Sequence, residues 1–421
     1  MGDGVHDRLR AEALRLFRVG LAAADPARAV TEALRARPLP PPGPGGRRLV
    51  IAIGKAAPAM AVAARAALAA TGEHVVTDAI VVTQDGNDRP VSGMRVIAAG
   101  HPVPDARGAA AAEAVIAALR ELGPRDQVLA LISGGGSALL PAPVEGVSLD
   151  DKIAVTRLLL ASGAEIGEIN LVRQNLSRLK GGGLARLAAP GTVTALILSD
   201  VVGDDLRAIA SGPTVAPLGD RALARAILDL HGVWDRAPES VRRHLLLPAD
   251  PSPVPAADNR LVGSNTQSLA AMAAAGARVW PRPLTGDVED AAHEILAAVQ
   301  ALAPGTAMAF GGETTVRVTG SGQGGRNQEL ALRFALAAAD RRLAGPWAFL
   351  AAGTDGRDGP TDAAGGVSDD TTPARARSRG LDLEAALADN DSHAALRTLG
   401  DLVVTGPTGT NVADLAVFVR G

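Results

Sequence analysis

One segment, Leu131–Leu140, carries the clearest chemical signal in this chain. An apolar run ends there in Ser133-Gly134-Gly135-Gly136-Ser137, and a helical pattern follows. A strand that opens into a glycine-rich turn at a helix start presents bare backbone N–H groups and the positive end of a helix dipole. This arrangement is typical of an anion site, most often for phosphate. It is not a Walker loop, because the spaced glycines and the Lys-Ser/Thr pair are missing.

Two cations stand beside glycine at the ends of predicted elements. Lys55 follows the buried run Leu49–Ile53 and Gly54, so its ammonium group can reach beyond the end of that strand. A solvated lysine in the first turn of a helix is the alternative, although a positive charge there opposes the helix dipole. Arg326 begins a helix after a glycine-rich loop, a position that suits a cation if an anion shares the site.

Further polar residues lie in glycine-rich loops and are candidates for binding substrate or nucleotide. His101 follows a predicted strand, where it is either a base, a ligand or a structural loop residue. Lys180 precedes a second glycine triplet and is preferred over the other cations of Arg173–Gly183, for which a solvated helix end is the alternative. The predicted binding residues are Ser133, Gly134, Gly135, Gly136, Ser137, His101, Lys180, Asn327 and Asn411.

Carboxylates at strand ends and in loops suit Mg²⁺, which takes one or two carboxylates together with substrate phosphates and water. Helix caps and plain turn clusters are the alternatives. The loop Gly353–Asp362 holds three aspartates but lacks the terminal Glu of an EF-hand. The predicted metal ligands, which are also candidates for orienting a substrate hydroxyl, are Asp200, Asp204, Glu313 and Asp355.

Bulk composition narrows the class of protein. The 421 residues suffice for two or three domains, and 47% of them are hydrophobic, although only 2% are aromatic. A net charge of -3 argues against a nucleic-acid partner, and the absence of cysteine excludes thiolate metal sites and cysteine nucleophiles. The N-terminus shows no signal pattern, and no apolar run reaches the roughly 18 residues that span a bilayer. These features predict a cytoplasmic protein without a membrane partner.

Apolar runs that alternate with helical patterns predict an α/β fold with a parallel sheet covered on both faces. A proline-rich stretch, Leu247–Ala257, suggests the boundary between domains 1–255 and 256–421, of which the second reads as another α/β domain. The predicted strands are Leu49–Ile53, Ala79–Val82, Arg95–Ala98, Val128–Ile132, Val193–Leu198, Arg260–Gly263, Thr306–Phe310, Thr315–Val318, Trp347–Ala352, Leu402–Thr405 and Leu415–Val419. The main predicted helices are Arg8–Leu21, Gly108–Leu122, Leu149–Ser162, Asn265–Ala275, Asp287–Leu302 and Asn327–Ala338.

Many glycine-rich strand ends, isolated cations and several carboxylates occur together without cysteine. Phosphoryl transfer depends on positioning and charge stabilisation rather than on covalent chemistry by the protein. Taken together, these candidate residues fit phosphoryl transfer, although no single cluster indicates that reaction by itself.

Motifs from about residue 50 to 412 resemble the glycerate 2-kinase family, whose C-terminal part is called the MOFRL domain. Members of that family have also been labelled hydroxypyruvate reductase. The motifs cover nearly the whole chain and are specific when taken in order. They are Ile53–Ala57, Gly100–Asp105, Ile132–Leu139, Gly312–Thr314, Gly325–Glu329 and Gly353–Gly359.

The resemblance implies a larger Rossmann-like domain with a three-layer parallel sheet, a smaller C-terminal α/β domain, and an active site in the cleft between them. It implies ATP-dependent phosphorylation of D-glycerate at the 2-hydroxyl to give 2-phosphoglycerate, with Mg²⁺. The catalytic lysine and arginine of the family correspond to Lys55 and Arg326. Whether the Ser133–Ser137 turn binds a phosphate of ATP or the glycerate carboxylate stays open. A homodimer is the assembly considered, although the sequence does not give the oligomeric state.

Two other readings compete with the kinase. An NAD(P)-dependent hydroxypyruvate reductase needs a G-x-G-x-x-G loop after a strand, with an acidic residue about 20 positions on. Gly320–Gly325 supplies the glycines at the start of a helix, but no clear acidic partner follows. A non-catalytic regulator that binds sugar acids or nucleotides is the third reading, and intact Lys55 and Arg326 argue against it.

Overall fold

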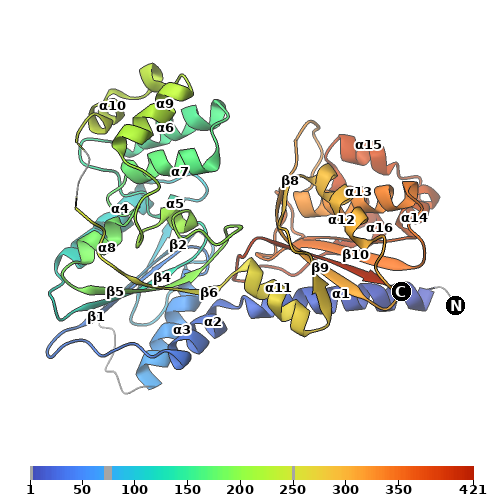
Figure 1. Cartoon of the computed structure of the whole chain (residues 1–421), viewed down its shortest axis with the longest axis horizontal. Helices are drawn as coiled ribbons and strands as arrows, with labels where there is room; N and C mark the ends of the chain where they lie inside the picture. Colours follow the sequence, from blue (N-terminus) through green and yellow to red (C-terminus); the bar gives the residue numbers. More distant parts are fainter. Residues whose placement is uncertain (1–2, 71–77, 249–251) are drawn as a thin grey trace. The chain divides into compact units, whose positions relative to one another are not determined.

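The computed structural model describes residues 3–70, 78–248 and 252–421. They form two compact α/β units (Figure 1). One unit comprises Pro26–Val262. The other comprises Gly263–Gly421 together with the N-terminal helix α1 (Asp3–Ala23).

The sheet of the first unit is of the doubly wound type. Its strand order is β3-β2-β1-β4-β5-β6, and the pairs β1–β2, β1–β4, β2–β3 and β4–β5 are parallel. The predicted Rossmann-like sheet is therefore confirmed, and its strand order reverses between β1 and β4, where such sheets bind ligands. The strands are β1 (Arg48–Ile53), β2 (Asp78–Gln84), β3 (Arg95–Ala99), β4 (Gln127–Ile132), β5 (Thr192–Leu198) and β6 (Asp258–Gly263).

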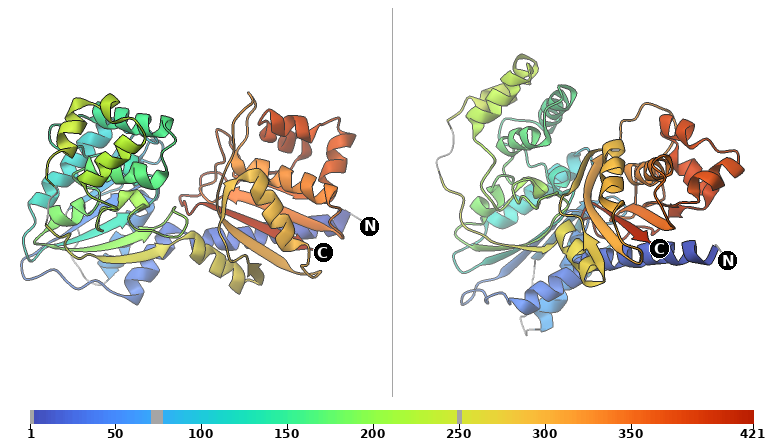
Figure 2. Two further views of the ribbon diagram at one scale, coloured as in Figure 1. Left: turned by 45° about the horizontal axis from the view of Figure 1, so that its top comes forward. Right: turned by 45° about the vertical axis from the view of Figure 1, so that its right-hand side comes forward.

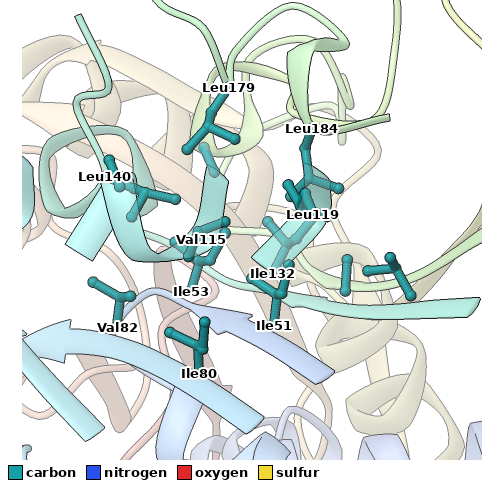
Figure 3. Close-up of a cluster of buried hydrophobic side chains, with 14 of the residues drawn as sticks. Ile51, Ile53, Ile80, Val82, Val115, Leu119, Ile132, Leu140, Leu179 and Leu184 are labelled. Carbon is teal, nitrogen blue, oxygen red and sulfur yellow. The ribbon is translucent and has the colours of Figure 1, made fainter. Parts of the chain in front are cut away.

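Helices cover both faces of this sheet. On one face lie α4 (Ala106–Arg120) and α8 (Gly183–Ala188), and on the other α2 (Pro26–Ala36) and α3 (Ala57–Ala70) (Figures 1 and 2). Strand β1 is buried along its whole length, which explains the apolar run Leu49–Ile53. Figure 3 shows Ile51, Ile53 and Ile132 packed against Val115 and Leu119 of α4. Aliphatic side chains alone thus fill this core.

Four helices of the first unit pack around a core of their own, which includes Val155, Ile169, Val172 and Leu228. Their sequences combine apolar stripes with polar starts, such as the capping box of Ser148 and Asp151. These helices are α6 (Leu149–Ala161), α7 (Ile166–Asn175), α9 (Arg221–Leu230) and α10 (Glu239–Leu245). Between β4 and α6 lies only the short α5 (Gly136–Leu139).

The second unit contains a mixed sheet in the order β12-β11-β10-β13-β9-β7, with β8 paired to β9. The pairs around β10 and β13 are antiparallel, whereas β7 and β8 run parallel to β9. The strands are β7 (Ala277–Val279), β8 (Leu284–Asp287), β9 (Ala307–Thr315), β10 (Trp347–Gly353), β11 (Gly365–Asp369), β12 (Leu402–Val403) and β13 (Asp414–Arg420).

Helices again cover both faces of the mixed sheet. Most of the chain's few aromatic rings lie in the core on one face of this sheet. Among them, Phe334 of α13 packs edge-on against Trp347, with ring centroids 5.2 Å apart. On one face lie α12 (Val288–Val299) and α13 (Arg326–Asp340), and on the other α1 and α11 (Asn265–Ala274). The short helices α14 (Thr372–Ser378), α15 (Leu383–Ala388) and α16 (Ser392–Leu399) pack beside α13.

The structure differs from the predicted organisation in three places. Helix α1 buries Leu16 and Phe17 in the second unit, because its apolar stripe meets β10 and β13 there. Strand β6 joins the first sheet, so the chain passes from the first unit to the second between Val262 and Gly263, and not after residue 255. The predicted strand Thr315–Val318 is wrong, since β9 ends at Thr315 and residues 316–319 form no strand.

In the described part of the chain, no helix has the length and apolar character needed to cross a membrane.

An ion-pair network fastens α1 to the second unit. The Arg10 guanidinium donates from Nε to Asp369 Oδ2 at 2.5 Å and from Nη1 to Asp401 Oδ1 at 2.6 Å. Both carboxylates are buried, with 2% and 1% of their side-chain surface exposed. Arg375 also binds Asp401, at 2.6 Å. Such buried carboxylates depend on their cations, because an unpaired buried charge is costly.

We expect Arg10→Ala to lower the free energy of unfolding of the second unit by about 3 kcal/mol, because two buried carboxylates lose a partner. Urea-induced unfolding measures the change. Arg15→Ala is the control on the same helix, since its ion pair with Glu12 is exposed and worth at most about 1 kcal/mol. Equal losses in both variants would contradict a special role for the buried network.

Candidate active site

The loops that follow β1 and β4 are hydrogen-bonded to each other at the point where the strand order reverses. The Ser133 N–H donates to the Ile53 carbonyl at 2.9 Å, and the Lys55 N–H donates to the Gly134 carbonyl at 2.9 Å. Gly54 has φ +119°, and a Cβ there would lie 2.2 Å from Ser133 Oγ. Only glycine permits this approach, which places Lys55 next to the glycine-rich turn.

Three predicted site residues gather around that turn from three different strand ends. A Cβ on Gly134 would lie 2.1 Å from Asp200 Oδ2, so the carboxylate touches the turn backbone. A Cβ on Gly135 would lie 3.2 Å from His101 Nε2 and 3.4 Å from Lys55 Cγ. The loops after β1, β3 and β5 thus bring Lys55, His101 and Asp200 together with Gly134 and Gly135.

Asp200 gives the turn an internal anion. Burial raises the pKa of this carboxyl group, while the nearby Lys55 ammonium and the backbone N–H of Gly135 oppose that shift. One donor of the predicted anion cradle is therefore used by a carboxylate of the chain itself. The following helix α5 has only four residues, too few for a strong dipole. The turn is consequently a site of mixed charge and not a bare phosphate cradle.

The two serines of the turn also have partners inside the protein. Ser133 Oγ accepts from the Ala56 N–H at 3.1 Å and is buried. Ser137 Oγ lies 2.8 Å from Ser211 Oγ. Lys180, which is buried as well, donates from Nζ to the Ser137 carbonyl at 2.6 Å and to Ser137 Oγ at 3.0 Å. Lys180 therefore lies against the same turn.

In the second unit, Arg326 lies at the first position of α13 and is held by carboxylates. Its Nε donates to Asp414 Oδ2 at 2.5 Å and its Nη2 to Asp414 Oδ1 at 3.0 Å, a bidentate pair. Glu313 Oε1 lies 3.2 Å from Nη2. Sequence reasoning missed Asp414, because it begins a strand far from Arg326 in the chain and no local pattern marks it.

The N-terminus of α13 is occupied by Asp358. This carboxylate accepts from the backbone N–H groups of Asn327 at 3.2 Å and Gln328 at 2.9 Å, and from Gln328 Nε2 at 3.1 Å. A Cβ on Gly325 would lie 2.2 Å from Asp358 Cγ, which explains the glycine. The anion expected beside Arg326 at the helix start is therefore a side chain of the protein. Burial, together with the Asp414 charge, raises the pKa of Asp358 to about 6.

The remaining predicted residues divide between the units. Asn327 Nδ2 donates to Asp358 at 3.3 Å, and Asn411 Oδ1 accepts from the Ala413 N–H at 3.3 Å. Asp355 Oδ1 accepts from the Arg357 N–H at 3.0 Å. Asp204 stands in the loop after β5 with φ +57°.

No group of three or more Asp, Glu or His side chains that could hold a metal converges within residues 3–70, 78–248 and 252–421. Of the four predicted metal ligands, Asp200 and Asp204 lie in the first unit, and Glu313 and Asp355 lie in the second. Mg²⁺ needs only one or two carboxylates when phosphates and water supply its other ligands. The two predicted carboxylates of either unit therefore fit that ion.

The loop Gly320–Gly325 does not have the structure of a dinucleotide-binding fingerprint. No strand leads into it, and the N–H groups of Gly320, Ser321 and Gln323 donate to Asn390, Asp389 and Asp391 at 2.8–3.1 Å. A pyrophosphate needs such donors to be available. The Gly320–Gly325 loop therefore lacks both the preceding strand and the available N–H donors that an NAD(P)-binding loop of a reductase needs.

The first unit has a doubly wound sheet with a lysine and a glycine-rich turn at its switch point. The second unit has a mixed sheet and an arginine bound by carboxylates. Together these features indicate a two-unit α/β enzyme of the kinase type. Residues 12–246 match the family model "Domain of unknown function (DUF4147)", and residues 306–414 match the MOFRL family. The chain belongs to the glycerate 2-kinase family with a C-terminal MOFRL domain, and the resemblance seen in the sequence is confirmed.

Several relatives match almost the full length of the chain. A glycerate 2-kinase of Pyrococcus horikoshii is 40% identical over 98% of this chain and 97% of its own. A D-glycerate 2-kinase of Thermotoga maritima is 38% identical over 98% of each chain. A relative from Agrobacterium vitis, 42% identical over 97% of this chain and 93% of its own, is provisionally named a hydroxypyruvate reductase.

The crystal structure of glycerate kinase from Thermotoga maritima has a TM-score of 0.88 with this chain at 37% identity, covering 99% of this chain and 100% of that one.

We expect Asp358 to make stability depend on pH. Its pKa is about 6 in the folded protein and about 4 in an unfolded chain, so between these values the folded state binds the proton more tightly. The free energy of unfolding should therefore fall as pH rises from 4 to 7, with a contribution of up to about 3 kcal/mol from this group.

Asp358→Asn should remove this component, which urea unfolding across that pH range measures. Asp340→Asn, at the exposed C-terminal end of α13, is the matched control and should keep the wild-type slope. A wild-type slope in Asp358→Asn would show that Asp358 does not titrate in this range.

Proposed function

We propose that this protein is a glycerate 2-kinase, which transfers the γ-phosphoryl group of ATP to the 2-hydroxyl of D-glycerate and releases 2-phosphoglycerate and ADP. The observation that carries the proposal is the near-complete match to two relatives named glycerate 2-kinase and D-glycerate 2-kinase. The geometry supports it, because Lys55 stands beside a glycine-rich turn at the switch point of a doubly wound sheet.

In this reaction the hydroxyl oxygen bonds to the γ-phosphorus while the bond from that phosphorus to ADP breaks. Lys55 stabilises the negative charge on the transferring group, and Arg326 supplies a second cation for the same reaction. Asp200 accepts the proton of the 2-hydroxyl, since the raised pKa of its carboxyl group makes it a stronger base than an exposed aspartate. In the first unit, Gly134 lies against Asp200 and Gly135 against Lys55, so both groups stand beside the same turn.

Mg²⁺, when bound, would neutralise charge on the phosphates of ATP. With Asp200 acting as the base, Asp204 would hold it in the first unit, and Glu313 or Asp355 in the second. A cytoplasmic location and small-molecule partners fit a metabolic kinase of this kind. The homodimer considered from the sequence stays a prediction.

The direct test is ³¹P NMR of the product formed from D-glycerate, ATP and Mg²⁺, because it separates 2-phosphoglycerate from 3-phosphoglycerate. We expect only the 2-phosphate. Oxidation of NADH or NADPH with hydroxypyruvate, without phosphate transfer to glycerate, would instead establish the reductase suggested by the Agrobacterium relative's name.

Lys55→Ala and Arg326→Ala should each lower kcat at least about 100-fold, the usual cost of removing a charge that stabilises a transition state. Arg341→Ala is the control, because Arg341 is exposed at the C-terminal end of α13. Near wild-type turnover in Lys55→Ala or Arg326→Ala would refute the role assigned to that residue, even if the protein is a glycerate 2-kinase.

A further inference from the structure

Three cations lie close together in the first unit, one of them against the glycine-rich turn, and no carboxylate among the described residues forms an ion pair with them. They are Lys152 of α6, Arg173 of α7 and Lys180 in the loop before α8. The two lysines are almost fully buried, with 3% and 4% of their surface exposed. Their ammonium groups contact neutral oxygens. Lys152 binds the carbonyls of Pro141 and Leu176 at 2.7 and 3.1 Å, and Lys180 binds Ser137.

The three charges act on one another. Burial lowers the pKa of Lys180, and the only charged side chains found to act on it in the described chain are Lys152 and Arg173, which lower the pKa further. Burial lowers the pKa of Lys152 in the same way, with Arg173 adding to the shift. Burying like charges together costs several kcal/mol unless a counter-ion or proton loss relieves them.

Arg173 is the member of the cluster that proton loss does not relieve. A guanidinium keeps its charge throughout the physiological range. Within the part of the chain that the structure describes, Arg173 makes no hydrogen bond or ion pair, although burial lowers its pKa. Its planar set of N–H donors is therefore available to a ligand, and that set matches a carboxylate or a phosphate.

Neutral polar groups connect this cluster to the turn. Asn170 lies three residues before Arg173 on α7, so both side chains share one face of the helix. Asn170 is buried, and its Oδ1 accepts from Ser211 Oγ at 3.4 Å. Ser211 Oγ in turn lies 2.8 Å from Ser137 Oγ. The amide nitrogen of Asn170 adds a donor to the same region.

We infer that Arg173, together with Asn170, Ser211 and Lys180, forms an oxyanion subsite next to the Ser133–Ser137 turn that holds the negatively charged group of a substrate. The inference rests on the proposed kinase function and deepens it. The oxyanion is either the carboxylate of D-glycerate or a phosphate of ATP, which share this chemistry. Its arrival supplies the missing counter-charge, allows Lys180 to keep its proton, and fixes the substrate beside Lys55 and Asp200.

Arg173→Gln should raise the KM of one substrate at least about tenfold with a smaller change in kcat, since a charge-assisted hydrogen bond is lost. A rise for D-glycerate assigns the carboxylate, and a rise for ATP assigns the phosphate. Arg173→Lys should recover part of the affinity. Arg157→Gln on α6, where the side chain is exposed, is the matched control and should keep both KM values. Unchanged KM values in Arg173→Gln overturn the inference.

A binding measurement separates this inference from the kinase proposal. Inorganic phosphate should raise the Tm of the wild type and of Arg157→Gln more than that of Arg173→Gln, even if glycerate is not the substrate. Asn170→Asp places a carboxylate inside the cluster, so it should raise the Tm of the free protein and abolish the stabilisation by phosphate. A lower Tm with undiminished phosphate stabilisation in Asn170→Asp would contradict an oxyanion subsite here.

Discussion

The site of the first unit depends on the close approach of two backbone loops at the switch point of its sheet. The hydrogen bonds from Ser133 to Ile53 and from Lys55 to Gly134 continue the pairing of β1 with β4 beyond the strands. They require glycine at position 54, because any Cβ there would collide with Ser133. This contact places Lys55 beside the turn, where His101 and Asp200 from two other loops also lie.

At both glycine-rich loops that suggested anion sites, an aspartate from another part of the chain occupies backbone N–H donors. Asp200 receives the N–H of Gly135, and Asp358 receives the N–H groups at the start of α13. Fixed carboxylates of this kind orient neighbouring cations before any substrate binds, which is the condition for electrostatic catalysis without reorganisation. They also explain the glycines, since a side chain at Gly134 or Gly325 would occupy the place of the carboxylate.

The charge balance differs between the two units. Arg326 is surrounded by Asp414, Glu313 and Asp358, so its charge is more than compensated within the second unit. The cluster around Arg173 has no carboxylate acting on it in the described chain. An arginine that is already paired is held in position, whereas an arginine without a partner retains its capacity to bind an anion. This contrast gives Arg326 and Arg173 different expected roles in the same reaction.

The sequence by itself determined the strands of the first sheet, six of the longer helices and the glycine-rich turn, because periodicity and glycine placement are local signals. It also predicted Lys55 and Arg326 as catalytic residues, from the order of the family motifs. It also determined the family, since ordered motifs extend over nearly the whole chain. Only the tertiary structure decided that α1 packs in the second unit, that β6 completes the first sheet, and that Asp414 and Asp358 hold the α13 start. Those outcomes depend on contacts between residues far apart in the chain, and an apolar stripe or an isolated aspartate does not specify its partner.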